Sequence, residues 1–173
     1  MKSIKFLSLF LVLIICMSCE KEDIAGKVKG PNNKWYEAQT TFTDEEINQL
    51  LMSKAWQRSS RQIYNSDWTV PKVNAGISPD GYWFSHIMFF DGKYFVEGAP
   101  EIDVARNYVN KTLETLGEDY LDKYTIKDGV IYLESNGYVQ KKTVLAINQD
   151  YIFFDSDFEK SGIRKEYWGK LPN

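Results

Sequence analysis

The sequence lacks the side chains on which several protein classes depend. Both cysteines, Cys16 and Cys19, lie in the first twenty residues, which excludes a disulfide-stapled body and a zinc site built on thiolates. His86 is the one histidine, and no Gly-x-Ser-x-Gly turn or glycine-rich phosphate loop is present. The 21 basic residues do not outnumber the 24 acidic ones, and they form no run suited to nucleic acid. We therefore predict a protein that is not an enzyme and has no metal site, cofactor or nucleic-acid partner.

A long apolar run is also absent. Residues 6–17 are apolar except for Ser8, and they follow a short positive region formed by Lys2 and Lys5. A transmembrane helix needs about 20 apolar residues. The segment 1–18 is therefore predicted to be a secretory signal peptide rather than a membrane span.

The end of this signal carries a family resemblance. Ser18 stands directly before Cys19, and Cys16 occupies the position where leucine is usual. The arrangement resembles the lipobox of bacterial lipoproteins. The resemblance implies that residues 1–18 are removed and that Cys19 is acylated, and two acyl chains give stable anchoring.

The residues that follow resemble a second signal. Lys21-Glu22-Asp23 is similar to the surface-export signal of Bacteroidetes lipoproteins, which implies an outer-membrane protein exposed on the cell surface. An ordinary charged stretch is the alternative interpretation. Without Lys2 and Lys5 the mature chain has 19 basic and 24 acidic residues, a net charge of −5. We therefore expect the lipid, rather than charge, to attach the protein to the membrane.

Between the anchor and the folded body we expect a flexible tether. Residues 19–41 contain Gly26, Gly30 and Pro31 among many charged residues, a composition typical of a linker. Trp35-Tyr36 is an apolar island within this segment that could dock on the body.

Two segments have helical signals. Thr43 and Glu46 form a capping box, and Phe42 and Ile47 occupy the positions of a hydrophobic staple, which together predict a short helix over 44–52. A second helix is predicted over 101–116, where apolar residues recur every three or four positions.

The rest of the chain is predicted to form strands. Asp-Gly pairs and an Asn-Gly pair separate apolar runs in the manner of tight β-hairpins. A meander of this length usually closes into a barrel, which removes its exposed edges. We predict a mainly β domain over 42–173, an eight-stranded antiparallel up-and-down barrel with a short N-terminal helix and one amphipathic helix inserted between strands. The expected strands are 55–65, 82–90, 93–96, 121–127, 130–134, 138–147, 151–154 and 163–171.

The order of these elements resembles the lipocalin-like domain of Bacteroidetes lipoproteins over residues 44–171. Trp56 matches the tryptophan of the first-strand Gly-x-Trp motif, although Lys54 replaces the glycine, and Asp150-Tyr151 matches part of a late turn. The resemblance implies that Trp56 plugs the base of the barrel. It also implies that an arginine of the last strand packs over Trp56, with Arg164 as the candidate and Lys165 as the alternative.

The first strand also supplies candidate binding residues. If Trp56 faces the interior, strand alternation directs Arg58 and Tyr64 inward as well. A buried guanidinium requires a partner. Glu166 and Asp150 are possible internal partners, and an anionic ligand is the functional alternative. In the third interpretation, Arg58 lies near the barrel rim in contact with solvent and has no function.

Trp83 and His86 complete the candidate binding set, although a histidine within an aromatic strand is more often part of the wall. The leading hypothesis is a barrel that binds a small apolar or amphipathic ligand without catalysis. The alternative is a surface module that binds a glycan or protein through the 66–81 loop and through exposed aromatic residues such as Trp35 and Trp68. A hydrolase with paired carboxylates ranks last, because the sequence gives no sign of such a pair.

Overall fold

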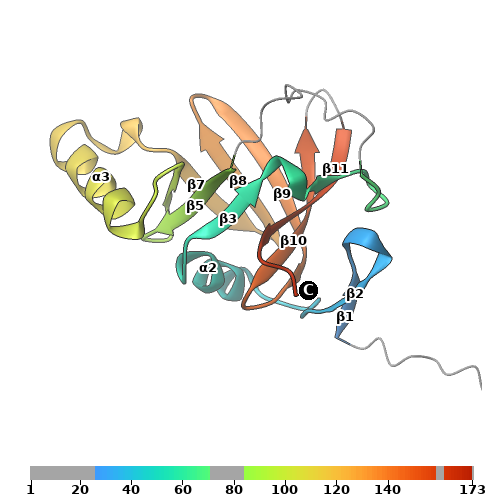
Figure 1. Cartoon of the computed structure of the whole chain (residues 1–173). Coiled ribbons are helices and arrows are strands. Elements are labelled where there is room, and N and C mark those ends of the chain that lie inside the picture. Colours follow the sequence, from blue (N-terminus) through green and yellow to red (C-terminus); the bar gives the residue numbers. More distant parts are fainter. Residues whose placement is uncertain (1–25, 71–83, 159–161, 173) are drawn as a thin grey trace, which may run out of the picture.

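The computed structural model describes residues 26–70, 84–158 and 162–172. In these ranges the protein is mainly β, and nine antiparallel strands form one sheet in the order β3-β5-β6-β7-β8-β9-β10-β11-β4. Figure 1 shows this sheet curled into a nearly closed barrel. Its strands are β3 (Trp56–Ser59), β4 (Ile63–Tyr64), β5 (Phe84–Phe90), β6 (Tyr94–Glu97), β7 (Lys123–Lys127), β8 (Val130–Ser135), β9 (Tyr138–Ile147), β10 (Tyr151–Phe158) and β11 (Gly162–Gly169).

The barrel closes through a break in its first strand. A 3-10 turn, η2 (Ser60–Gln62), divides the expected strand 55–65 into β3 and β4. β3 pairs with β5 at one edge of the sheet, whereas β4 pairs with β11 at the other edge. The sheet therefore has nine strands rather than the expected eight. From β5 to β11 each strand pairs with the next one along the chain, so the meander was predicted correctly.

The tight turns of the meander follow from their sequences. Asp91-Gly92, Asp128-Gly129 and Asn136-Gly137 all have positive φ at both residues. This backbone is that of a type I′ turn, which matches the right-handed twist of the flanking strands. The three hairpins expected at these positions are present.

Helix α2 (Asp44–Met52) closes the base of the barrel. The Thr43 side chain accepts a hydrogen bond from the amide of Glu46, and the Glu46 carboxylate accepts one from the amide of Thr43, which confirms the capping box. Leu51 is fully buried among the inward side chains of the barrel. Trp56 is also fully buried at this base, and its indole N–H donates to the carbonyl of Leu51 at 3.0 Å.

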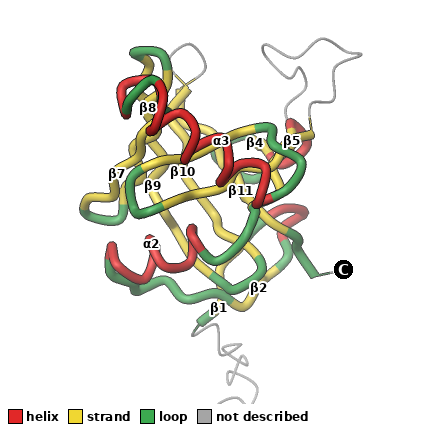
Figure 2. Tube along the Cα trace, turned by 90° about the vertical axis from the view of Figure 1, so that its left-hand side faces the viewer, coloured by secondary structure: helices red, strands yellow, loops and turns green. Residues whose placement is uncertain are grey.

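Helix α3 (Ile102–Thr115) packs on the outer face of β5 and β6, where Figure 2 shows it lying across the barrel wall. Along β5, Ile87 and Phe89 face the interior, whereas Met88 and Phe90 lie beneath the helix. The helix therefore covers a strand that is apolar on both faces. Because α3 is inserted between β6 and β7, these two strands are registered over a short stretch only, and the barrel is incompletely closed there.

The N-terminal segment differs from the expected tether. Residues 26–41 contain a hairpin of β1 (Lys27–Lys29) and β2 (Trp35–Glu37), linked by the 3-10 turn η1 (Pro31–Asn33). Tyr36 is buried against Tyr151 and Phe153 on the outer face of β10, and the backbone of Gln39 bridges to that of Ile147. Of the apolar pair expected to dock on the body, Tyr36 does so, and its ring holds the hairpin on the barrel together with the Gln39–Ile147 bridge.

Candidate functional site

Four charged side chains from four strands lie together inside the barrel. They are Arg58 on β3, Glu97 on β6, Lys142 on β9 and Glu166 on β11. Because side chains alternate along a strand, each shares a face with the core residue two positions away. Those core residues are Trp56, Phe95, Val144 and Trp168. The four charged residues, here called the ion cluster, therefore form a polar layer directly above the apolar base.

The deepest part of the ion cluster is the pair Lys142–Glu166. The ammonium of Lys142 donates to Oε2 of Glu166 at 2.6 Å and to the hydroxyl of Ser156 at 3.1 Å. Ser156 donates in turn to Oε2 of Glu166 at 2.7 Å, and the indole N–H of Trp168 donates to Oε1 at 2.7 Å. Hydrogen bonds of this kind are what allow a charged pair to be buried.

Arg58 connects this buried pair to solvent. Its Nη1 lies 2.7 Å from Oε1 of Glu97, and its Nε lies 3.5 Å from Oε1 of Glu166. The Arg58 side chain is 9% exposed, whereas that of Glu97 is 40% exposed. Ser85 also donates to Glu97, at 3.3 Å. The ion cluster is therefore accessible at its Glu97 end and sealed at its Lys142 end.

Burial and neighbouring charges shift the pKa values of Lys142 and Glu166 in opposite directions. Burial lowers the pKa of Lys142 to about 8, although the negative charge of Glu166 opposes the shift. Burial alone raises the pKa of Glu166, but the charges of Lys142 and Arg58 together outweigh it and lower that pKa to about 2. Both partners of the pair are therefore charged near neutral pH.

Aromatic rings hold the two cations in place. The ring of Trp168 lies 5.9 Å from the guanidinium carbon of Arg58 and 5.3 Å from the ammonium of Lys142. Phe154 lies 6.0 Å from the same ammonium. Cation–π contacts at these distances add to the ion pairs. The ion cluster is thus preorganised by its surroundings.

Of the two partners that the sequence suggests for Arg58, only one lies near it. Glu166 is one of its partners, whereas Asp150 lies in the exposed turn after β9, with its carboxylate 3.8 Å from the ammonium of Lys54. Sequence reasoning missed Glu97 and Lys142. A signal existed for Lys142, because it lies two positions before Val144 on an alternating strand.

The expected inward position of Tyr64 is wrong. The turn η2 interrupts the alternation that begins at Trp56, so the ring of Tyr64 packs on the outer face against Trp68 and Tyr167, at centroid distances of 5.6 and 6.2 Å. Trp68 is buried in the same outer cluster and offers no exposed ring. Neither aromatic residue can contact a ligand inside the barrel.

His86 also lies outside the barrel. It is half-buried on β5, on the face opposite to that of Ile87. This position agrees with a wall histidine rather than with a residue that contacts an interior ligand. The predictions for Trp83 and Cys19 fall outside the described residues.

The cation that covers the base tryptophan is not the expected one. Arg164 donates to the side-chain oxygen of Asn65 near the opposite end of the barrel, and Lys165 pairs with Asp155. The ammonium of Lys54 lies 4.5 Å from the centroid of the Trp56 ring. The residue that replaces the usual glycine of the motif thus provides the cation–π contact that was expected from the last strand.

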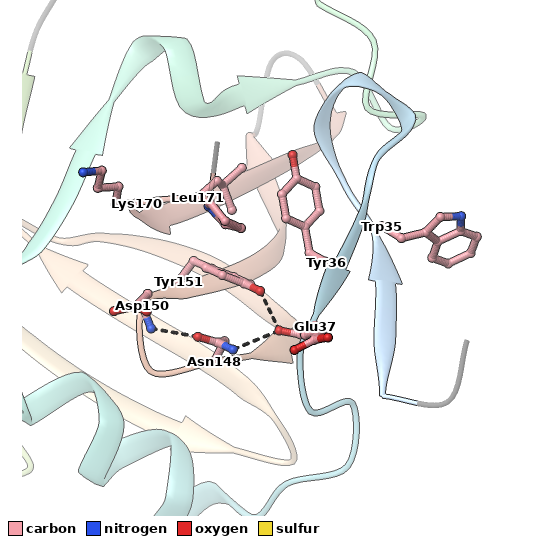
Figure 3. Close-up of a pocket in the computed structure, with 9 residues that line it drawn as sticks. Trp35, Tyr36, Glu37, Asn148, Asp150, Tyr151, Lys170 and Leu171 are labelled. Carbon is pink, nitrogen blue, oxygen red and sulfur yellow. Dashed lines mark hydrogen bonds between the residues drawn. The ribbon is translucent and has the colours of Figure 1, made fainter. Parts of the chain in front are cut away.

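A groove lies outside the barrel, where the hairpin meets the turn after β9. Figure 3 shows this groove, which has a volume of about 700 Å³. The hydroxyl of Tyr151 and the side-chain amide of Asn148 both donate to the backbone carbonyl of Glu37, so these polar groups serve to fix the hairpin. The groove is lined by Trp35, Tyr36, Glu37, Asn148, Asp150, Tyr151, Lys170, Leu171 and Pro172.

In the described part of the chain, no group of three or more His, Cys, Asp or Glu side chains is placed to hold a metal ion. The helices of the described ranges include none long and apolar enough to cross a bilayer. Comparisons with protein-family models, curated proteins and solved structures find no match to this chain. The functional argument therefore depends on the residues of this chain alone.

Proposed function

We propose that the protein is a lipid-anchored lipoprotein of the outer membrane, exposed on the cell surface, whose lipocalin-like barrel binds a small amphipathic ligand without catalysing a reaction. Cys19 carries the anchor in this account, and Arg58 binds an anionic group of the ligand. The barrel architecture and the lipobox-like sequence around Cys19 support the proposal.

One observation supports a binding site at Arg58. Arg58 is buried inside the barrel, yet Glu97, its partner at 2.7 Å, is half-exposed. A carboxylate that already has access to water loses little hydration when it moves away from the guanidinium. A ligand anion can therefore replace Glu97 beside Arg58, while Glu166 and Lys142 remain paired below.

The packed apolar base of the barrel limits where a ligand can lie. Fourteen buried residues, including Trp56 and Trp168, fill the base as one packed cluster. We therefore place the anionic group at Arg58 and the rest of the ligand on the side of the ion cluster away from this base. Lys142 and Glu166 are sealed from solvent, which leaves them no direct contact with a substrate and agrees with a role without catalysis.

Calorimetric titration with decanoate and with uncharged decanol tests this site. We expect the wild type to bind decanoate more tightly than decanol. Glu97→Gln should strengthen decanoate binding, because the Glu97 carboxylate no longer competes with decanoate for Arg58. The gain is about tenfold if this competition costs about 1.4 kcal/mol of binding free energy. Arg58→Met should remove the preference for decanoate. Equal binding of the two compounds by the wild type would contradict the proposal.

A surface interaction module is the second candidate, and the outer side of α3 favours it. Val104, Tyr108, Leu116 and Tyr120 all belong to this helix or to the turn after it, and all are exposed. Tyr108→Ala combined with Tyr120→Ala would abolish capture of a glycan or protein partner if this candidate is correct. The same change should leave decanoate binding intact if the interior site is correct.

A further inference from the structure

The outward face of the N-terminal hairpin combines one tryptophan with two lysines and one glutamate. Val28 and Tyr36 point toward the barrel, whereas Lys27, Lys29, Trp35 and Glu37 point away from it. Glu37 is the cross-strand partner of Lys27 on this face. Lys29 and Trp35 are cross-strand partners, so their side chains are neighbours on this face. Trp35 is 45% exposed, and Figure 3 shows its indole directed away from the groove.

The hairpin is also the described part of the chain nearest to the proposed anchor in sequence. Seven Cα–Cα steps separate Cys19 from Gly26, which spans at most about 25 Å. Gly26 immediately precedes β1, and its carbonyl accepts a hydrogen bond from the amide of Ala38 beside β2. An acylated Cys19 therefore keeps this face close to the lipid surface, where even a weak affinity is strengthened by the high effective concentration.

The side chains on this face suit a bilayer interface. Tryptophan favours the headgroup level, where the apolar part of the indole meets the acyl chains and its N–H remains in a polar layer. Lysine side chains extend to the phosphates while their stems cover apolar surface. Residues 26–41 contain Lys27, Lys29 and Lys34 but only one acidic residue, Glu37, in a mature chain of net charge −5. Residues 26–41 therefore have a net charge of +2, whereas residues 20–23, which join them to Cys19, have a net charge of −2.

We propose that the outward face of this hairpin, with Trp35 at its centre, docks on the phospholipid surface of the membrane that holds the Cys19 anchor. The inference rests on the proposed lipid anchoring. Figure 1 shows the hairpin toward the same end of the barrel as α2. Docking therefore turns the packed base toward the membrane, and the ion cluster takes its ligand from the aqueous side.

The test uses acylated full-length protein reconstituted in phosphatidylcholine vesicles whose lipids are brominated near the headgroup, since bromine quenches nearby indoles. We expect quenching in the wild type. Trp35→Phe should reduce the quenching to the level seen in vesicles without bromine, and Lys29→Glu combined with Lys34→Glu should weaken it. Trp68→Phe is the matched control, because Trp68 is buried against Phe153, and should leave the quenching unchanged.

The mass of the protein, measured on the same sample, separates the two proposals. An unacylated Cys19 overturns the anchor and the docking together. Acylated protein in which Trp35 is not quenched overturns the docking alone, and it leaves the hairpin available to a soluble glycan or protein partner. Quenching that depends on Trp35 supports the docking.

Discussion

The ammonium of Lys142 lies 2.6 Å from Oε2 of Glu166, and the two side chains are 0% and 1% exposed. Both groups lose their hydration in this position, and the pair is tolerated because Ser156 and Trp168 supply additional hydrogen bonds to the carboxylate. Removing one partner leaves the other charge buried with fewer compensating contacts. The polar layer is therefore the part of the barrel most sensitive to single substitutions.

Lys142→Met should destabilise the fold by about 3 kcal/mol, because it leaves Glu166 with Arg58 as its remaining ionic partner. Lys141→Met is the matched control, since Lys141 is the adjacent residue and is exposed. We expect the control to change the unfolding free energy by less than about 0.5 kcal/mol. Urea denaturation measures both values, and equal losses would contradict the buried pair.

Glu166 should make stability depend on pH in the acid range. Its pKa is about 2 in the folded protein, against an ordinary value of 4.5, so the unfolded chain takes up the proton first as the pH falls. The stabilisation from ionised Glu166 is complete above about pH 4.5 and is lost between pH 4.5 and 2, roughly 3 kcal/mol in total. Glu166→Gln lacks this titration. The difference in unfolding free energy between the wild type and Glu166→Gln should therefore shrink as the pH falls. Urea denaturation at several pH values measures this difference, and a difference that does not change with pH would refute the assignment.

The attachment of the hairpin to the barrel should depend on Tyr36 and not on the neighbouring Trp35. Tyr36→Ala removes the ring that packs on Tyr151 and Phe153, and loss of a buried aromatic side chain typically costs about 3–5 kcal/mol. We expect trypsin to cleave at Lys27, Lys29 or Lys34 in this variant while the barrel stays folded. Trp35→Ala, which changes an exposed residue on the same strand, should leave the wild-type protection in place. Rapid cleavage of the wild type would restore the interpretation of this segment as a tether.

Cys19→Ala should release the protein from the membrane. Mass spectrometry and detergent partitioning measure the loss of acyl chains and of membrane retention, and unchanged partitioning would refute the anchor. Changing Lys21, Glu22 and Asp23 to alanine should keep the acyl chains but protect the protein from protease added to intact cells. A protein that stays accessible would support the interpretation of these residues as an ordinary charged stretch.

The features predicted well from the sequence are those fixed by neighbouring residues. The capping box of α2 and the Asp-Gly and Asn-Gly turns depend on contacts within a few positions, and the structure contains all of them. The break at Ser60–Gln62 could not be predicted in this way, because no glycine or proline marks it. The break lies where the chain passes from pairing with β5 at one edge of the sheet to pairing with β11 at the other.

The ion cluster was only partly predictable for a similar reason. Arg58 could be placed by its distance of two residues from Trp56, and Glu166 could be named as a partner. Glu97 lies 39 residues from Arg58, and Lys142 lies 24 residues from Glu166. Which of these side chains meet depends on the register of strands far apart in the chain. That register is a property of the closed sheet rather than of any local pattern.

Native mass spectrometry of the protein purified from its own cells shows whether the barrel holds a ligand at Arg58. We expect the wild type to carry a bound small molecule in addition to the acylated polypeptide. Arg58→Met, after circular dichroism has shown that it is folded, should lack this mass, whereas Lys141→Met should retain it. A wild-type mass equal to that of the acylated polypeptide alone, or an added mass that persists in Arg58→Met, would contradict a ligand held by Arg58 inside the barrel.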